Sequence, residues 1–196
     1  MPSLFVRSGI YLAAVGDDLV ALDVQGGDYG CLPGAGRAVP PCGPDGRLNL
    51  ADEALAAVLL EAGLVDREPA GGARVDLPPS ATVSCWRVER ASIAPIERRR
   101  FVRAYLAAAP RFWRARFGDL VGEARRLGQG PAACADPETL RDAQVFDQLV
   151  PWAPFQGECL FRAFLLLAYL RLGGRDATWV FGVRTYPFQA HCWLQI

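Results

Sequence analysis

A helix that is apolar on nearly all of its faces is the feature that most constrains this chain of 196 residues. The pattern predicts this helix from about Glu158 to Leu172, and it contains the uninterrupted apolar run Ala163 to Leu170. Such a helix has no polar face to present to water, so other elements must surround it. The run is far shorter than the roughly 20 residues that cross a bilayer, which predicts a buried core helix and no membrane span.

The segments on either side of this helix are expected to enclose it. Pro95 suits the first turn of a preceding helix, and Pro110 is expected to interrupt that helix because proline lacks the N–H that a helix interior needs. Asp136 is a good N-cap for another helix. The pattern therefore predicts helices from Pro95 to Pro110, at 112–127 and at 136–149, followed by strands at 177–183 and 188–194.

The first part of the chain has the pattern of a small module of strands and one helix. Alternating and β-branched residues predict strands at 10–15 and 19–24, joined by a turn at Gly16, and a short third strand from Tyr29 to Leu32. Proline and glycine then predict a loop at 33–46. Asn49 or Asp52 can cap a helix that runs to about Ala62 and ends at Gly63.

Charge divides the chain in two. Residues 1–79 carry 5 arginines and 11 acidic residues, whereas residues 80–196 carry 16 arginines and 10 acidic residues. A stretch rich in proline and glycine lies between these parts. The sequence therefore predicts an α+β fold with one domain at 1–70, a linker at 71–80 and a second domain at 81–196. One domain with a long loop is the alternative.

Composition excludes several classes of function. Basic and acidic residues balance at 21 each, which argues against binding to nucleic acid through counterion release. All the basic residues are arginines, so lysine chemistry is excluded. A single histidine and the absence of a Cys-x-x-Cys pair give no basis for a metal site, and no cofactor is expected. Residues 1–15 lack the apolar core of a secretory signal, so we expect a cytoplasmic protein.

Cys159 and His191 are the candidate catalytic residues. Cys159 begins the buried helix, where free N–H groups and the helix dipole favour a thiolate and can hold an oxyanion. His191, the one histidine, lies on the last predicted strand and can serve as the base. Cys192 is the weaker candidate, because neighbouring strand residues point to opposite faces and its thiol should lie across the sheet from the imidazole. A buried inert cysteine and a structural histidine are the alternatives.

These residues stand in a pattern that resembles the lasso peptide B proteins. The matching segments are Gly-Glu-Cys-Leu-Phe-Arg from Gly157, Val-Phe-Gly-Val from Val180, and Pro-Phe-Gln-Ala-His-Cys-Trp from Pro187. The resemblance covers about residues 150–196. It implies a transglutaminase-like (papain-like) α+β cysteine protease that removes the leader from a ribosomal precursor, with Cys159 as nucleophile and His191 as base. The family's Asp, expected about a dozen residues after the histidine, would lie beyond Ile196.

The first part is similar to the leader-recognition module fused to these proteases. The similarity rests on Asp-Leu-Val-Ala-Leu-Asp-Val from Asp18 and Gly-Asp-Tyr-Gly-Cys-Leu-Pro from Gly27. It implies a small winged-helix-like domain, similar to the pyrroloquinoline-quinone D protein, that recognises the leader. We expect the leader to add as a strand at the edge of the small sheet, with the helix from Asp52 to Ala62 as the other wall. The leader-binding residues would be Tyr29, Gly30, Cys31 and Leu32. The implied partners are the lasso precursor peptide and an ATP-dependent lasso cyclase.

Three functions stay open at the level of sequence. The first is hydrolysis of the bond between leader and core. The second is a non-catalytic protein that binds and presents the precursor, with a degenerate hydrolase domain, which the missing acid favours. The third is acyl transfer to an amine, because the acceptor that reaches the thioester decides between hydrolysis and aminolysis. The acidic residues within the chain do not decide among these functions. Asp176 is expected to lie too far from His191 to orient its ring, and the positions of Asp142 and Asp147 do not follow from the sequence.

Overall fold

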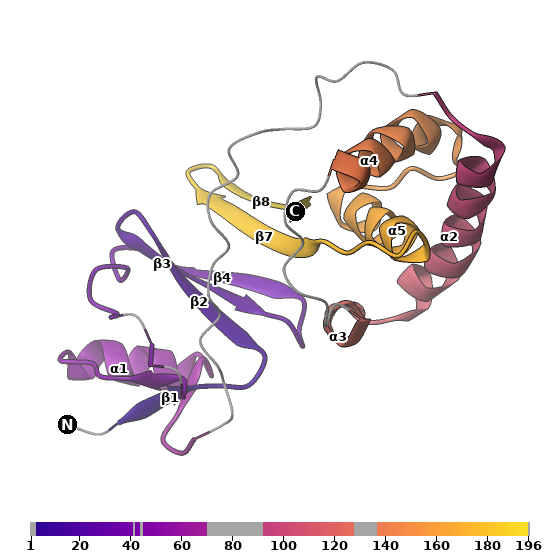
Figure 1. The fold of residues 1–196 in the computed structure, drawn as a ribbon. Helices are drawn as coiled ribbons and strands as arrows, with labels where there is room; N and C mark the ends of the chain where they lie inside the picture. The colour runs from indigo at the N-terminus through magenta and orange to yellow at the C-terminus, as the bar shows by residue number, and fades with distance from the viewer. Residues whose placement is uncertain (1–2, 41, 44, 70–91, 128–136, 196) are drawn as a thin grey trace. The chain divides into compact units, whose positions relative to one another are not determined.

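The computed structural model describes residues 3–40, 42–43, 45–69, 92–127 and 137–195 (Figure 1). The chain falls into two compact units. One comprises Met1–Pro78 with Val183–Gln189, and the other Pro79–Gly182 with Ala190–Ile196. The predicted linker at 71–80 lies outside the described residues. No helix in the described ranges is both long and apolar enough to cross a membrane.

The first unit contains two small antiparallel sheets. The predicted meander is confirmed: β2 (Ile10–Val15), β3 (Asp18–Asp23) and β4 (Asp28–Leu32) are hydrogen-bonded in that order. The second sheet has the order β5-β1-β6 and was not predicted. Its strands are β1 (Leu4–Val6), β5 (Arg47–Leu48) and β6 (Val65–Asp66). Strands of two or three residues are too short to show an alternating pattern. The sequence therefore did not indicate β5, which directly follows the loop expected at 33–46.

Helix α1 (Glu53–Glu61) closes the core of this unit. The Asp52 carboxylate caps the helix by accepting hydrogen bonds from the N–H groups of Ala54 and Leu55, so Asp52 rather than Asn49 is the N-cap. Gly63 follows the C-terminus with φ +68°, as expected for a residue that ends a helix. Leu59 is fully buried in a core that both sheets share. The winged-helix-like arrangement of this unit stays a prediction.

The second unit encloses the apolar helix. That helix, α5 (Cys159–Leu172), follows α2 (Pro95–Arg114), α3 (Phe117–Leu127), α4 (Pro137–Leu149) and the short 3₁₀ helix η2 (Val150–Trp152). Strands β7 (Thr178–Thr185) and β8 (Phe188–Gln195) form a two-stranded sheet after it, of which residues Val183–Gln189 belong to the first unit. Half of the residues in α5 are buried, and its rings and leucines share one core with α2, α4 and η2. Its enclosure by neighbouring elements is therefore confirmed for the described residues.

The expected helix break at Pro110 is wrong. Helix α2 continues through Pro110 to Arg114, and the break falls at Ala115, whose ψ of 149° is extended. The Asp119 side chain accepts a hydrogen bond from the backbone N–H of Arg116, which favours the start of α3 there. Packing of Ala104 and Ala108 against the core holds α2 together near the proline, so tertiary contacts override its local preference.

A buried charge cluster joins the helices of this unit. Asp142 of α4 accepts two hydrogen bonds from Arg100 of α2, at 3.0 and 2.6 Å, and the same guanidinium donates to the hydroxyl of Tyr169 in α5. The Arg100 guanidinium also lies 4.3 Å from the centroid of the Tyr169 ring. A Cβ at Gly173 would lie 2.0 Å from Arg100 Nη1, so glycine is needed for this close approach. The cluster fixes the relative placement of three helices.

A second ion pair lies at the start of α2. Burial would raise the pKa of the Glu97 carboxyl, but hydrogen bonds from Arg141 and from the Ala94 N–H bring that pKa below its usual value. A lowered folded-state pKa gives stability that is complete above the unfolded pKa of about 4.5 and is lost as the pH falls through the folded value. Glu97 therefore stabilises the fold at neutral pH and not in strong acid.

Replacing Glu97 with glutamine should lower the thermal midpoint at pH 7 and have progressively less effect as the pH falls below 4.5. The measurement is the thermal midpoint of both proteins from pH 7 to pH 3. Glu123→Gln is the matched control, since Glu123 lies 3.8 Å from Arg111 in a more exposed pair, where the expected contribution is about 0–1 kcal/mol. A difference that stays constant down to pH 3 would contradict the assigned role of the Glu97 carboxylate.

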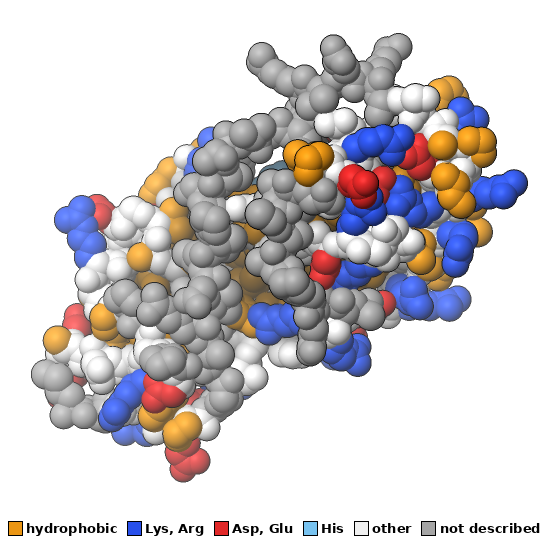
Figure 2. All heavy atoms as spheres, viewed as in Figure 1, with side chains coloured by type: hydrophobic (Ala, Val, Ile, Leu, Met, Phe, Trp, Pro, Cys, Tyr) orange, Lys and Arg blue, Asp and Glu red, His pale blue; other side chains and the backbone are white. Residues whose placement is uncertain are grey.

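The outer face of α2 mixes arginines with apolar side chains. Val102, Leu106 and Trp113 are exposed by 53%, 66% and 63%, at spacings that put them on one face of the helix. Figure 2 shows hydrophobic and arginine side chains interleaved on the surface over this helix. Trp113 stands at the C-terminal end of that face.

Candidate functional site

Cys159 is the first residue of α5. The N-cap residue Glu158 has an extended backbone, and its side chain makes no capping hydrogen bond. The first turn of α5 contains no acidic residue. Among the described residues, no carboxylate therefore caps the N–H groups of that turn. These N–H groups remain able to bind an anion. The Cys159 thiol is half-buried and is not in a disulfide.

Cys192 of β8 lies beside Cys159. The pKa of the Cys192 thiol is raised to about 12, mainly because the thiol is buried and in part because it is hydrogen-bonded to the neighbouring Cys159 thiol. The Trp179 indole N–H lies near the same thiol and partly offsets this rise, yet it makes no hydrogen bond of good geometry within the described residues. At pH 7 a thiol with that pKa is ionised in only about 1 molecule in 10⁵, so Cys192 is a poor nucleophile.

His191 lies on the other face of β8. The imidazole is exposed, whereas Cys192, the next residue, is 5% exposed, as strand alternation predicts. The His191 ring stacks on Trp193, with centroids 6.2 Å apart. A Cβ at Gly182 would lie 2.7 Å from the Trp193 ring, so the Trp193 indole packs against β7 at a residue that has no side chain. The structure brings Cys192, and not His191, to the Cys159 thiol: among the described contacts no hydrogen bond joins Cys159 to His191.

The three aspartates considered as partners for His191 are each bound by an arginine. Asp142 accepts from Arg100, Asp147 from Arg162 at 2.9 Å and Asp176 from Arg171 at 2.9 Å. Asp176 also accepts from the Ala177 N–H. Each carboxylate therefore has a structural role in the second unit.

The segment before Cys159 is held tightly. Gly157 has φ +65°, and a Cβ there would lie 2.7 Å from both Cβ and Cδ1 of Phe161. The Phe155 N–H donates to the hydroxyl of Tyr105 in α2 at 3.2 Å. Contacts at residues 155 and 157 thus fix the path of the chain into the first turn of α5.

Gly157→Ala should therefore displace the Cys159 thiol. The added methyl group clashes with Phe161 in addition to the left-handed strain, and small displacements of a reacting group cost about tenfold or more in rate. The measurement is the rate at which iodoacetamide alkylates Cys159, followed by peptide mass spectrometry. Gly174→Ala is the matched control, because Gly174 has φ +75° but no heavy atom within 4 Å of the added Cβ. Equal alkylation rates in wild type and both variants would show that Gly157 does not position the thiol.

The predicted leader-binding residues lie on β4. This strand is last in the order β2-β3-β4 and is bonded to β3 alone among the described strands. Gly30 and Cys31 are exposed, while Tyr29 and Leu32 are half-buried. Leu32 packs into the same core as Leu59 of α1. The four residues therefore stand on a sheet edge, a position from which a further strand can add.

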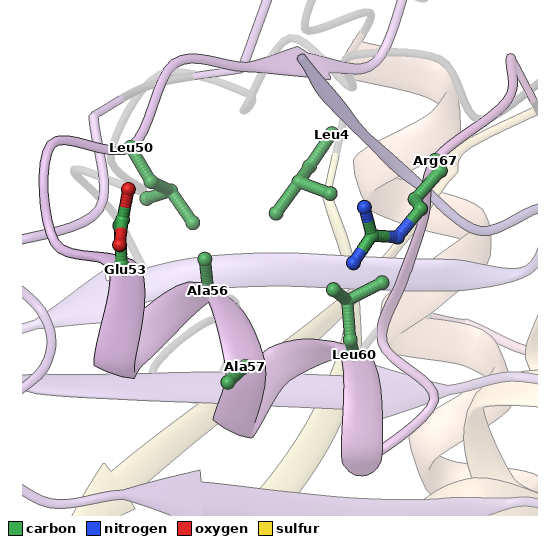
Figure 3. A pocket seen from close by; sticks show the side chains of 7 residues that line it. All are labelled: Leu4, Leu50, Glu53, Ala56, Ala57, Leu60 and Arg67. Carbon is green, nitrogen blue, oxygen red and sulfur yellow. The ribbon is translucent and has the colours of Figure 1, made fainter. Parts of the chain in front are cut away.

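A groove of about 210 Å³ runs along α1 in the same unit (Figure 3). Apolar side chains make most of its lining, with one charged residue of each sign; the lining residues are Leu4, Leu50, Glu53, Ala56, Ala57, Leu60 and Arg67. In Figure 3, Leu4 of β1 and Leu50 of the segment before α1 face the helix across the groove. No sequence pattern indicates this groove, because its walls come from segments that are far apart in the chain.

The matched part of the chain is transglutaminase-like. Residues 102–196 match the model of the transglutaminase-like superfamily, a class that includes cysteine proteases and transferases. The match extends from α2 to the end of the chain and contains both Cys159 and His191. No curated protein and no solved structure matches the chain closely enough to be compared with it. The second unit is therefore compatible with a hydrolase of the cysteine protease type.

Proposed function

We propose that the chain is a cysteine leader peptidase of lasso peptide maturation, with Cys159 as its nucleophile. The observation that carries the proposal is the position of Cys159 at the uncapped N-terminus of α5, inside the transglutaminase-like part of the chain. The sequence pattern around Cys159 and His191, which resembles the lasso peptide B proteins, supplies the substrate class. We expect the reaction to take place in the cytoplasm.

The proposed reaction is acyl transfer to water. The Cys159 sulfur attacks the carbonyl carbon of the leader–core bond, and the N–H groups of the first turn of α5 stabilise the oxyanion. His191 takes the thiol proton and gives it to the leaving amine of the core. Water then attacks the thioester and releases the leader as a carboxylic acid. This role requires β8 to present the imidazole to Cys159 when substrate is bound, since catalytic hydrogen bonds often form only in that complex.

In the same proposal, the leader adds as a strand at β4, beside Tyr29 to Leu32. Main-chain hydrogen bonds would give affinity, and pockets for alternate side chains would give specificity. Replacing single leader residues by their N-methyl forms should weaken binding at every second position, because alternate N–H groups of an edge strand face the sheet. Fluorescence anisotropy with the full-length Cys159→Ala protein measures this. Uniform losses, or losses three to four residues apart, would contradict strand addition.

The partners follow from the same proposal. The precursor would meet the protein through its leader, which the resemblance expects to carry threonine at its penultimate position. An ATP-dependent lasso cyclase would close the ring of the released core. Neither step requires a metal or an organic cofactor in this chain.

A non-catalytic presentation protein is the second candidate. The observation that favours it is the exposed His191, which stacks on Trp193 on the face of β8 opposite to Cys192. If the imidazole never reaches Cys159, the thiol lacks its base and the chain binds the precursor without cleaving it.

Mass spectrometry of a lasso precursor incubated with the protein separates these candidates. The proposed peptidase yields free leader and free core. A presentation protein leaves the precursor intact while binding it. An acyltransferase yields the leader joined to an added primary alkylamine in preference to the free acid.

A further inference from the structure

An exposed aromatic patch lies beside the start of α5. Its outer members are Trp113 at the end of α2 and Phe155 in the segment before Cys159, with ring centroids 4.9 Å apart. Their side chains are 63% and 40% exposed. Two large rings packed together at a tilt in solvent expose apolar area that a bound apolar group would cover.

Buried rings hold this patch in place. Phe161, which is 1% exposed, lies 5.4 Å from Phe155 and 5.0 Å from Phe112, and Phe112 in turn lies 5.8 Å from Trp113. The hydrogen bond from the Phe155 N–H to the Tyr105 hydroxyl fixes the backbone at the same place. The outer rings therefore stand on a rigid base, which lowers the entropic cost of ordering them when a ligand binds.

The patch is within reach of the nucleophile. Phe155 precedes Cys159 by four residues, and four residues span at most about 14 Å of chain. An extended peptide advances about 3.3 Å per residue, so a side chain two to four residues from the scissile bond can cover that distance. The distance from Cys159 to the patch therefore suits contact with a substrate residue near the cleaved bond rather than with a remote part of the substrate.

We propose that Trp113 and Phe155 form a specificity subsite for an apolar side chain of the substrate, on the acyl side of the scissile bond. The inference rests on the proposed function. The acyl side is favoured because that part of the substrate stays attached to Cys159 through both steps, so contacts with it act on both. The subsite selects leucine or phenylalanine over small or acidic residues three or four positions before the cleaved bond.

Peptide chloromethyl ketones test the subsite without needing the natural precursor. Two series, acetyl-Xaa-Ala-Thr-Ala and acetyl-Ala-Xaa-Thr-Ala, each carry the electrophile at the C-terminus, with Xaa as Phe, Leu, Ala or Asp. Alkylation forms the bond from Sγ to the methylene carbon and releases chloride. The rate at Cys159 is followed by intact-mass and peptide mass spectrometry. In one series we expect Phe and Leu to react about tenfold faster than Ala, and Asp to react more slowly than Ala.

Variants assign the preference to the patch. Trp113→Ala should remove the preference while leaving the rate with the Ala probe within about twofold, and Trp113→Phe should restore most of it. Trp152→Ala is the matched control: Trp152 is 86% exposed and belongs to no ring contact among those described, so its removal should leave the preference intact. Thermal melts of each variant verify the fold.

Three kinds of result overturn the proposal. Alkylation of Cys159 at equal rates for all Xaa, or an unchanged preference in Trp113→Ala, removes the subsite but leaves the proposed nucleophile. A failure of every probe to label Cys159 removes the proposed function and the subsite with it. A change of oligomeric state in Trp113→Ala with unchanged rates would assign the patch to self-association instead.

Discussion

Replacing Cys159 with alanine should abolish leader removal while leaving the thermal midpoint and the leader affinity of the protein unchanged. The thiol is the only proposed nucleophile, so its loss removes the covalent route entirely. The side chain is half-buried at a helix end, where alanine is easily accommodated. Cleavage is measured by mass spectrometry of the precursor, and affinity by anisotropy of a labelled leader.

Two further variants make this prediction specific. Cys192→Ala keeps the proposed nucleophile and removes a thiol whose pKa of about 12 makes it inert at pH 7, so it should retain most activity. His191→Ala removes the proposed base, and loss of a positioned base costs about 10²–10⁴ in rate. An active Cys159→Ala protein, or an inactive Cys192→Ala protein that still folds, would overturn the assignment of the nucleophile.

Asp142→Ala should strongly destabilise the second unit. Asp142 is 4% exposed in its side chain, and Arg100, its partner, is 16% exposed. Removing one member of a buried pair leaves the other charge uncompensated and costs about 3–5 kcal/mol. Arg175 Nε also lies 3.4 Å from the same carboxylate, so a second guanidinium loses this contact. Urea denaturation measures the change in the free energy of unfolding.

Asp147→Ala is the matched control for this prediction. Asp147 is on the same helix and pairs with Arg162, but the side chains are 39% and 35% exposed. An exposed pair of this kind contributes about 0–1 kcal/mol. Similar losses in the two variants would show that the buried cluster does not hold α2, α4 and α5 together.

The helices of the second unit were largely predictable because their signals are local. An apolar run that ends at a pair of glycines bounded α5, and Pro137 marked the first turn of α4. The break between α2 and α3 was not predictable, because core packing carries α2 past Pro110 and the start of α3 depends on the Asp119 hydrogen bond. The second sheet of the first unit was not predictable, because its strands pair residues more than forty positions apart in the sequence.

The candidate site was predictable only in part. Strand alternation placed His191 and Cys192 on opposite faces of β8, and the structure agrees. Alternation does not say which face meets α5, and the thiol pair of Cys159 and Cys192 became visible only in three dimensions. The aromatic patch likewise joins Trp113 to Phe155 across a gap in sequence that no local pattern spans.

Trapping the acyl-enzyme tests the role of Cys159 most directly. The full chain is mixed with a lasso precursor, quenched in acid within the first turnover and digested, and the peptides are sequenced by mass spectrometry. We predict a leader-derived acyl group on Cys159, as a thioester that hydroxylamine removes and that the Cys159→Ala protein never forms. An acyl group on Cys192, or precursor cleavage with the same efficiency in Cys159→Ala, would contradict this role.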